Sequence, residues 1–389
     1  MIEIGSERIQ VFDTTLRDGE QAAGNRLTPR QKLEIAHQLN TLNVDVIEAG
    51  FPASSPGDLE AVKLIARKIR GPVITGLARA VEKDIDQLWE AVCKAEQNRI
   101  HIVLGSSDKH ISGKFSSSRE AVLQRGVDAV RYAKKLTDQV EYSTEDASRS
   151  DFDYLCRVVE EVIKAGATVV NIPDTVGWAV PEEFGPLIHR IKERVPLTDK
   201  VILSVHCHND LGFATSNTMA AIKNGAQQVE VTINGIGERA GNASLEEVVM
   251  LLDRRGDYYK RGTNIDISEI LTTSKMVSEM MALPVQANKA IVGKNAFAHS
   301  SGIHQDGILK ETGTYEIIPP KLLGLDKHQI ILTARSGKHA LKHTYNELGI
   351  QLNDRELKQL YPHFLNFADS HKNISHSDLK KLYKSAVDR

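Results

Sequence analysis

Short runs rich in valine and isoleucine recur at fairly even intervals through residue 233. They lie at 9–13, 44–48, 73–77, 100–104, 140–144, 168–172, 201–206 and 229–233. Runs that stay apolar, without alternation, are typical of parallel strands buried on both faces. Segments with helical spacing lie between them, for example at 29–42, 55–69, 118–136, 151–165 and 181–195. The pattern predicts an α/β fold built from strand–helix units.

Eight such units within about 250 residues match the repeat of a (β/α)8 TIM barrel. The structural alternative is a doubly wound open sheet, which normally carries a glycine-rich phosphate turn after its first strand. The stretch at that place is Asp13-Thr-Thr-Leu-Arg17, which has no glycine. We therefore expect a TIM barrel.

The pattern changes after about residue 255. One helix is expected at 267–281, a loop-like stretch at 293–309, and further helices at 339–348, 354–370 and 377–386. We expect a catalytic barrel over residues 1–255. Residues 256–389 should form a linker and helical subdomains. We expect this part to be a helical extension of the barrel and not a second catalytic core.

Charge and composition exclude several functional classes. The net charge is −2 with 26% charged residues, so no basic surface for nucleic acid is expected. Three widely spaced cysteines do not suggest a disulfide framework. No segment has the length of a membrane span, and the first residues lack the apolar core of a secretory leader. We expect a soluble cytoplasmic protein that binds neither nucleic acid nor membrane.

Ionisable and polar residues gather where the expected strands end. TIM barrels carry their chemistry at the C-terminal ends of the strands, so these side chains should share one rim. They include Asp13, Arg17, Asp18, Glu48, Arg79, His101, Ser143, Glu145, Asp146, Asn171, Asp174, Thr175, His206 and His208. Some of them have structural alternatives. His101 lies inside a strand and could be a core histidine, and Glu145 could be a helix N-terminal acid.

His206 and His208 are two residues apart on one strand, so both side chains point to the same side, away from Cys207. Asp18 can add an oxygen ligand, and Arg17 a fixed positive charge for an anionic substrate. Imidazoles with carboxylate and amide oxygens suit Mn, Zn, Co or Mg. A Lewis acid beside an arginine suits carbon–carbon bond formation or cleavage at a 2-oxo acid.

Several sequence motifs extend this pattern. Leu16-Arg-Asp-Gly-Glu-Gln21 is followed by Lys32, and a second motif runs from Leu203 to Gly212 through His-Cys-His-Asn-Asp. Further motifs are Gly-Phe-Pro at 50–52, Ile-Pro-Asp-Thr at 172–175, Gly-Ile-Gly-Glu-Arg-Ala-Gly-Asn at 235–242 and Ser-Gly-Ile-His-Gln-Asp-Gly at 301–307. Over about residues 8–340 the chain resembles the alpha-isopropylmalate and homocitrate synthase family of the DRE-TIM metallolyase superfamily.

The resemblance implies an acyltransferase that joins acetyl-CoA to a 2-oxo acid in a Claisen-type condensation and then hydrolyses the thioester. In the isopropylmalate branch the oxo acid is 3-methyl-2-oxobutanoate, and the reaction opens leucine biosynthesis. The implied metal ligands are Asp18, His206, His208 and Asn242. The implied catalytic residues are Arg17, Glu238, His304 and Tyr315, the last two reaching the active site of the partner in a homodimer.

The resemblance also implies a substrate wall formed by Leu77, His101, Ser143, Glu145, Asn171 and Thr175. Asp18 stands where the homocitrate branch usually has glutamate, and a small Ser143 leaves room for an isopropyl group. One methylene is worth only about 1–3 kcal/mol of discrimination, so citramalate synthase (pyruvate) and homocitrate synthase (2-oxoglutarate) remain alternatives. A metal-dependent lyase or aldolase is less favoured because Glu238-Arg239 replaces that branch's loop cysteine. The other alternative is a non-catalytic binding barrel.

Family members commonly continue into a C-terminal domain that binds leucine for feedback inhibition. The printed sequence ends at Arg389, where that domain would begin. Residues 1–389 are therefore expected to contain no leucine-binding regulatory domain.

Overall fold

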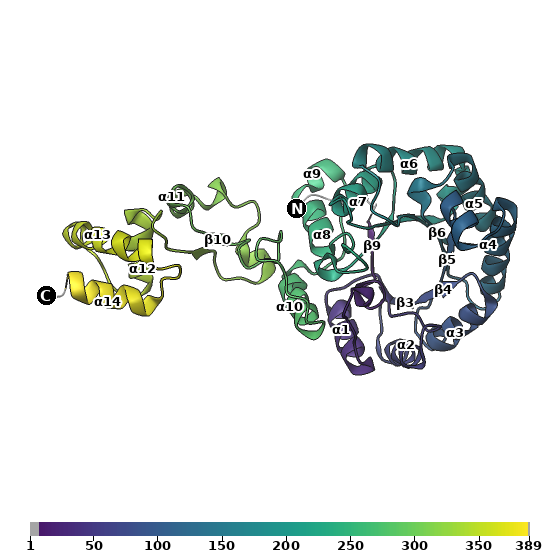
Figure 1. Cartoon of the computed structure of the whole chain (residues 1–389), viewed down its shortest axis with the longest axis horizontal. Helices are drawn as coiled ribbons and strands as arrows, with labels where there is room; N and C mark the ends of the chain where they lie inside the picture. The colour runs from purple at the N-terminus through teal and green to yellow at the C-terminus, as the bar shows by residue number, and fades with distance from the viewer. Residues whose placement is uncertain (1–7, 388–389) are drawn as a thin grey trace. The chain divides into compact units, whose positions relative to one another are not determined.

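Nine parallel strand segments form one ring in the computed structural model, which describes residues 8–387 apart from the Thr312 side chain (Figure 1). Their order around the ring is β3-β2-β1-β9-β8-β7-β6-β5-β4. The strands are β1 (Gln10–Asp13), β2 (Val46–Glu48), β3 (Val73–Thr75), β4 (Leu77–Arg79), β5 (Ile100–Gly105), β6 (Val140–Glu145), β7 (Val169–Asp174), β8 (Ile202–Cys207) and β9 (Gln228–Val231).

The third expected strand is divided at Gly76 into β3 and β4. β3 pairs with β2, whereas β4 pairs with β5, so this strand closes the ring. A Cβ atom at Gly76 would lie 2.8 Å from the Gly50 carbonyl oxygen, which explains why glycine stands at the break. The prediction of a TIM barrel is confirmed.

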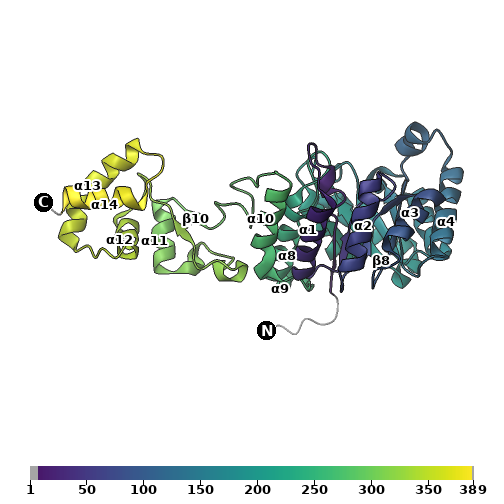
Figure 2. The same ribbon diagram turned by 90° about the horizontal axis from the view of Figure 1, so that it is seen from below.

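Helices surround the ring (Figures 1 and 2). They are α1 (Pro29–Thr41), α2 (Pro56–Lys68), α3 (Glu82–Val92), α4 (Arg119–Lys134), α5 (Phe152–Ala165), α6 (Pro181–Arg194), α7 (Ala214–Lys223) and α8 (Leu245–Arg254). Several of them begin with a side-chain cap. Thr28 and Gln31 form a capping box at α1, and Ser55 and Asp151 accept backbone N–H groups at the starts of α2 and α5.

Polar side chains cross the interior of the barrel below its C-terminal rim. Arg99 Nη1 donates to Glu141 Oε2 and to Gln228 Oε1, each at 2.8 Å. Gln228 Nε2 in turn donates to Ser204 Oγ at 2.9 Å. The Arg99–Gln228 bond spans the interior, because Arg99 directly precedes β5 and Gln228 lies on β9, which is not a neighbour of β5 in the ring.

The compact unit that contains the barrel extends to Val285, beyond the expected boundary at residue 255. After α9 (Gly256–Tyr259), α10 (Ile270–Met280) packs against α1. Gln38 Nε2 of α1 donates to Glu269 Oε2 and to Thr273 Oγ1, each at 3.0 Å. The sequence pattern assigned Glu269 and Thr273 to the extension, but long-range hydrogen bonds attach them to the barrel.

The second compact unit begins at Gln286. It contains a short parallel pair, β10 (Ala298–His299) and β11 (Gln329–Ile330), and the helices α11 (Gly302–Lys310), α12 (Lys338–Glu347), α13 (Asp354–Ser370) and α14 (His376–Ala386). The last three helices confirm the expected helical segments. They pack around Leu341, Tyr345, Leu360, Phe364 and Leu379.

The loop expected at 293–309 is wrong for its second half, where α11 forms. Two of its nine residues are glycine, which weakens the helical signal, and the helix is held by tertiary contacts. Gln305 is buried and donates to the His299 and Ile331 carbonyl oxygens at 2.8 Å. Among residues 8–387, no helix combines the length and apolarity that crossing a membrane requires.

Candidate active site

A cavity of about 340 Å³ opens at the C-terminal rim of the barrel. Most of the site residues expected from the sequence line it. They are Arg17, Asp18, Leu77, His101, Ser143, Glu145, Asn171, Thr175, His206, His208 and Glu238. Strand-end residues far apart in the sequence thus share one cavity.

Three buried side chains in this cavity converge on one point. The Nε2 atoms of His206 and His208 lie 3.1 Å apart, and they lie 3.9 and 3.8 Å from Asp18 Oδ2. Asn242 joins them, because its Nδ2 donates to Asp18 Oδ1 at 2.7 Å. The buried Asn242 Oδ1 atom has no hydrogen-bond partner among the described residues. A buried acceptor of this kind fits a missing ligand.

The electrostatics favour a cation at this point. Burial lowers the pKa of both His206 and His208 to about 4, so both imidazoles are neutral at neutral pH. Burial alone would raise the pKa of Asp18, but Arg17 and the two histidines hold it well below its usual value. A carboxylate, two neutral imidazoles and an amide oxygen are a donor set for a divalent metal.

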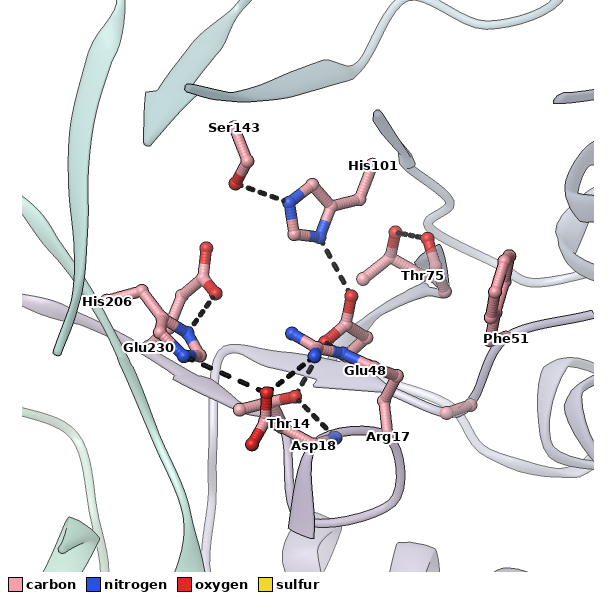
Figure 3. Close-up of polar contacts among 12 residues, drawn as sticks. Thr14, Arg17, Asp18, Glu48, Phe51, Thr75, His101, Ser143, His206 and Glu230 are labelled. Carbon is pink, nitrogen blue, oxygen red and sulfur yellow. Dashed lines mark hydrogen bonds and ion pairs between the residues drawn. The ribbon is translucent and has the colours of Figure 1, made fainter. Parts of the chain in front are cut away.

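His206 is oriented by a residue that the sequence did not single out. Its Nδ1 lies 2.7 Å from Glu230 Oε2 (Figure 3). The tautomer that carries its proton on Nδ1 donates to this oxygen and leaves the Nε2 lone pair for the cavity. Glu230 stands directly opposite His206 in the β8–β9 pairing. The sequence feature that could have indicated Glu230 was a lone glutamate inside the apolar run at 229–233.

Arg17 is held by two carboxylates (Figure 3). Its Nε donates to Glu48 Oε2 at 2.7 Å and its Nη1 donates to Asp18 Oδ2 at 2.6 Å. Thr14 Oγ1 also donates to Glu48 Oε2, at 2.6 Å. Glu48 therefore fixes the guanidinium beside the predicted metal ligands. It was expected at the rim as a strand-end residue but not as a member of the site.

His101 lines the cavity and is also fully hydrogen-bonded, so both interpretations of it hold in part. Nδ1 lies 2.8 Å from Glu48 Oε1, and Nε2 lies 2.9 Å from Ser143 Oγ. Burial would lower the pKa of His101, but the Glu48 carboxylate outweighs it and raises the pKa to about 9. The protonated ring then donates from both nitrogens.

His101, Glu141 and Glu230 form a second buried group whose ligand atoms lie within 4.8 Å of one another. Arg99 pairs with Glu141, and the His101 cation faces Glu48. Arg99 compensates Glu141, and burial raises the pKa of Glu230 to about 7, so we interpret the group as an internal support for the site above it.

Glu145 and Thr175, which also line the cavity, are each held by a hydrogen bond to a neighbouring loop. Glu145 is the last residue of β6 and lies outside the first turn of α5, so it is not a helix N-terminal acid. Lys114 Nζ donates to both of its carboxylate oxygens, at 2.9 and 2.8 Å. Thr175 Oγ1 accepts the backbone N–H of Asp146 at 2.9 Å.

Glu238 lies on the glycine-rich loop after β9, and its backbone N–H donates to Asp18 Oδ1 at 3.2 Å. His304 and Tyr315 belong to the second unit, where their rings stack with centroids 4.2 Å apart. The catalytic roles expected for these three residues stay predictions.

Comparison with known proteins identifies the family. Residues 8–277 match the HMGL-like family model, and residues 291–372 match the homocitrate synthase post-HMGL domain-like model. A 2-isopropylmalate synthase of Carboxydothermus hydrogenoformans is 55% identical over 98% of this chain and 75% of its own length. That of Pyrococcus furiosus is 52% identical over 98% of this chain and 77% of its own length. The chain belongs to the 2-isopropylmalate synthase family.

Membership of the 2-isopropylmalate synthase family makes the chain an acyl-CoA-dependent acyltransferase. Solved structures agree on the fold. An HMG-CoA lyase of Bacillus subtilis aligns with a TM-score of 0.62 at 20% identity, covering 73% of this chain and 97% of that one. The HMG-CoA lyase of Pseudomonas aeruginosa also gives 0.62, at 19% identity over 72% of this chain and 95% of that one.

Proposed function

We propose that the chain joins acetyl-CoA to 3-methyl-2-oxobutanoate, giving 2-isopropylmalate and CoA, as a step of leucine biosynthesis. The observation that carries this proposal is the donor set of Asp18, His206, His208 and Asn242 beside the Arg17 guanidinium. The names of the relatives, at 51–57% identity, point to the same reaction.

Mn, Zn, Co or Mg bound by these four residues would polarise the ketone oxygen of the 2-oxo acid as a Lewis acid. Arg17 stabilises the negative charge that develops on the same oxygen. Its Nε and Nη1 are anchored on Glu48 and Asp18, so the guanidinium is fixed before substrate arrives. The energy of reorganisation is therefore small.

Carbon–carbon bond formation needs a base for the acetyl methyl group. An imidazole oriented by the Glu238 carboxylate takes that proton, and the methyl carbon then attacks the ketone carbon while the ketone electron pair moves to the oxygen. We assign His304 and Tyr315 of the partner subunit in a homodimer to this site, with His304 as the imidazole that Glu238 orients. Water then cleaves the thioester and releases CoA and the free carboxylate.

The apolar part of the cavity fits a branched side chain. Leu77, Val103 and Pro173 line it, and Ser143 adds a small residue. Ser143 Oγ accepts from Asn171 Nδ2 at 2.8 Å and meets His101 Nε2, so its own hydrogen is left for another acceptor. The wall combines an apolar pocket with one directed hydroxyl.

A panel of 2-oxo acids tests the proposal. Purified protein with acetyl-CoA and Mn²⁺ should release CoA with the highest kcat/KM on 3-methyl-2-oxobutanoate, against pyruvate and 2-oxoglutarate. A higher value for pyruvate would assign the chain to citramalate synthesis, and one for 2-oxoglutarate to homocitrate synthesis. Cleavage of 2-isopropylmalate without acetyl-CoA turnover would indicate a lyase.

A further inference from the structure

Arg239 makes contacts that link three strand-end loops of the barrel. Its Nε and Nη2 donate to Asp210 Oδ1 and Oδ2, both at 2.8 Å, and Nη2 also donates to the Thr175 carbonyl oxygen at 2.9 Å. Thr175 follows β7, Asp210 follows β8 and Arg239 follows β9. A bidentate arginine–carboxylate pair fixes direction as well as distance.

The backbone at this point is unusual. Arg239 has a φ of +56°, a left-handed conformation that costs a non-glycine residue roughly 1 kcal/mol or more. The loops after β7 and β8 also approach each other closely, because a Cβ at Gly177 would lie 2.6 Å from the Asp210 backbone nitrogen.

The loop from Gly235 to Asn242 has two separate attachments. At its C-terminal end, His208 and Asn242 form a backbone bridge, and Asn209 N donates to the Gly241 carbonyl oxygen at 2.9 Å. That end carries the predicted metal ligand Asn242. At the apex of the loop, the backbone N–H of Glu238 donates to Asp18 Oδ1 at 3.2 Å, and the Arg239 side chain contacts Asp210 and Thr175.

We propose that Arg239 and Asp210 form a clamp that positions Glu238 for proton abstraction without contributing to metal binding. This inference rests on the proposed function, because Glu238 belongs to the base dyad there. The backbone bridge keeps Asn242 in place without the clamp. The apex would move when the clamp is broken, and a displacement of about 1 Å can cost on the order of 100-fold in rate.

The variants Asp210→Asn and Arg239→Gln test the clamp from its two sides. Each should lower kcat by up to about 100-fold with a smaller change in KM, and the double variant should be no worse than either single one. Arg239→Lys keeps the charge but loses the bidentate fork, so its kcat should be intermediate. Mn²⁺ affinity, measured by titration of metal-free protein, should match the wild type in all of them.

Three further measurements complete the design. Arg239→Gly relieves the backbone strain and removes the clamp, so its kcat should also fall. Glu120→Gln breaks an exposed bidentate pair with Arg157 on the outer helices and should leave kcat unchanged. Hydrogen exchange at residues 236–240 should be faster in Asp210→Asn than in the wild type.

Wild-type kcat in Asp210→Asn and Arg239→Gln would overturn the clamp, as would a loss of Mn²⁺ binding in both. A raised KM in the Arg239 variants alone would instead mean that Arg239 binds substrate. If the wild type turns over no 2-oxo acid, the proposed function fails. Hydrogen exchange still tests the clamp in that case, and unchanged exchange at 236–240 would overturn it.

Discussion

His206 and Glu230 stand opposite each other on neighbouring strands, with Nδ1 of the ring 2.7 Å from Oε2 of the carboxylate. The contact lies inside the barrel, and both side chains are buried. It fixes the tautomer of His206, so that Nε2 presents a lone pair toward Asp18 and His208. The predicted metal site therefore depends on a residue that makes no contact with the metal position itself.

Replacing Glu230 with glutamine should weaken metal binding by about 10- to 100-fold, because the amide orients the imidazole less strongly than the carboxylate does. Titration of metal-free protein with Mn²⁺ measures this. Glu193→Gln is a matched control, since Glu193 pairs with His189 on the exposed surface of α6. Equal affinities in the wild type and Glu230→Gln would contradict the role of Glu230.

Gly237→Ala should also impair the metal site. A Cβ at this position would lie 2.1 Å from Asn242 Nδ2 and 2.6 Å from Asp18 Oδ1, so two predicted ligands must move. We expect Mn²⁺ affinity to fall well below that of Gly57→Ala, where the added Cβ meets its nearest atom at 3.8 Å. The prediction fails if both alanine variants bind Mn²⁺ as the wild type does.

Enlarging Ser143 should change the choice of 2-oxo acid. Ser143→Leu fills the space beside Leu77 and Val103, which should disfavour an isopropyl group relative to the methyl group of pyruvate. The ratio of kcat/KM values should shift toward pyruvate by about 10- to 200-fold. An unchanged ratio would mean that the substrate side chain lies elsewhere in the cavity.

The His101–Glu48 pair predicts how stability depends on pH. The pKa of His101 is raised to about 9 in the folded protein, so the contribution is fully present below about pH 6.5 and is lost as the pH rises through 9. Between pH 6.5 and 9 the wild type should lose on the order of 3 kcal/mol more unfolding free energy than His101→Gln. Denaturant titrations at the two pH values measure this, and equal losses would contradict it.

The barrel could be predicted because buried parallel strands produce continuous apolar runs, and these runs can be recognised in the sequence without knowledge of tertiary contacts. The division at Gly76 and the attachment of α10 to α1 depend on long-range contacts, such as that of Gln38 with Thr273. No local sequence pattern predicts such long-range contacts. The helix α11 was missed for a similar reason, because Gln305 and its partners hold a stretch of low helical propensity.

The gathering of the expected metal ligands and substrate-wall residues at one rim could be predicted, because these residues follow strands directly or lie in recognisable motifs. Glu230 was missed because its one sequence signal, a lone glutamate inside an apolar strand, does not show which side chain it contacts. Glu48 was seen at a strand end, but its bonds to both Arg17 and His101 emerge only when β1, β2 and β5 close into a ring. The roles of Glu230 and Glu48 both depend on contacts with side chains from other strands, which the sequence does not show.

The dependence of CoA release on metal tests the central claim most directly. Protein treated with a chelator and then freed of it should release no CoA from acetyl-CoA and 3-methyl-2-oxobutanoate, and added Mn²⁺ should restore the release. Asp18→Asn, which loses the carboxylate that Arg17 and Asn242 contact, should stay inactive at the same Mn²⁺ concentration. CoA release that survives metal removal, or that Asp18→Asn supports at the wild-type rate, would contradict a metal-dependent condensation at this site.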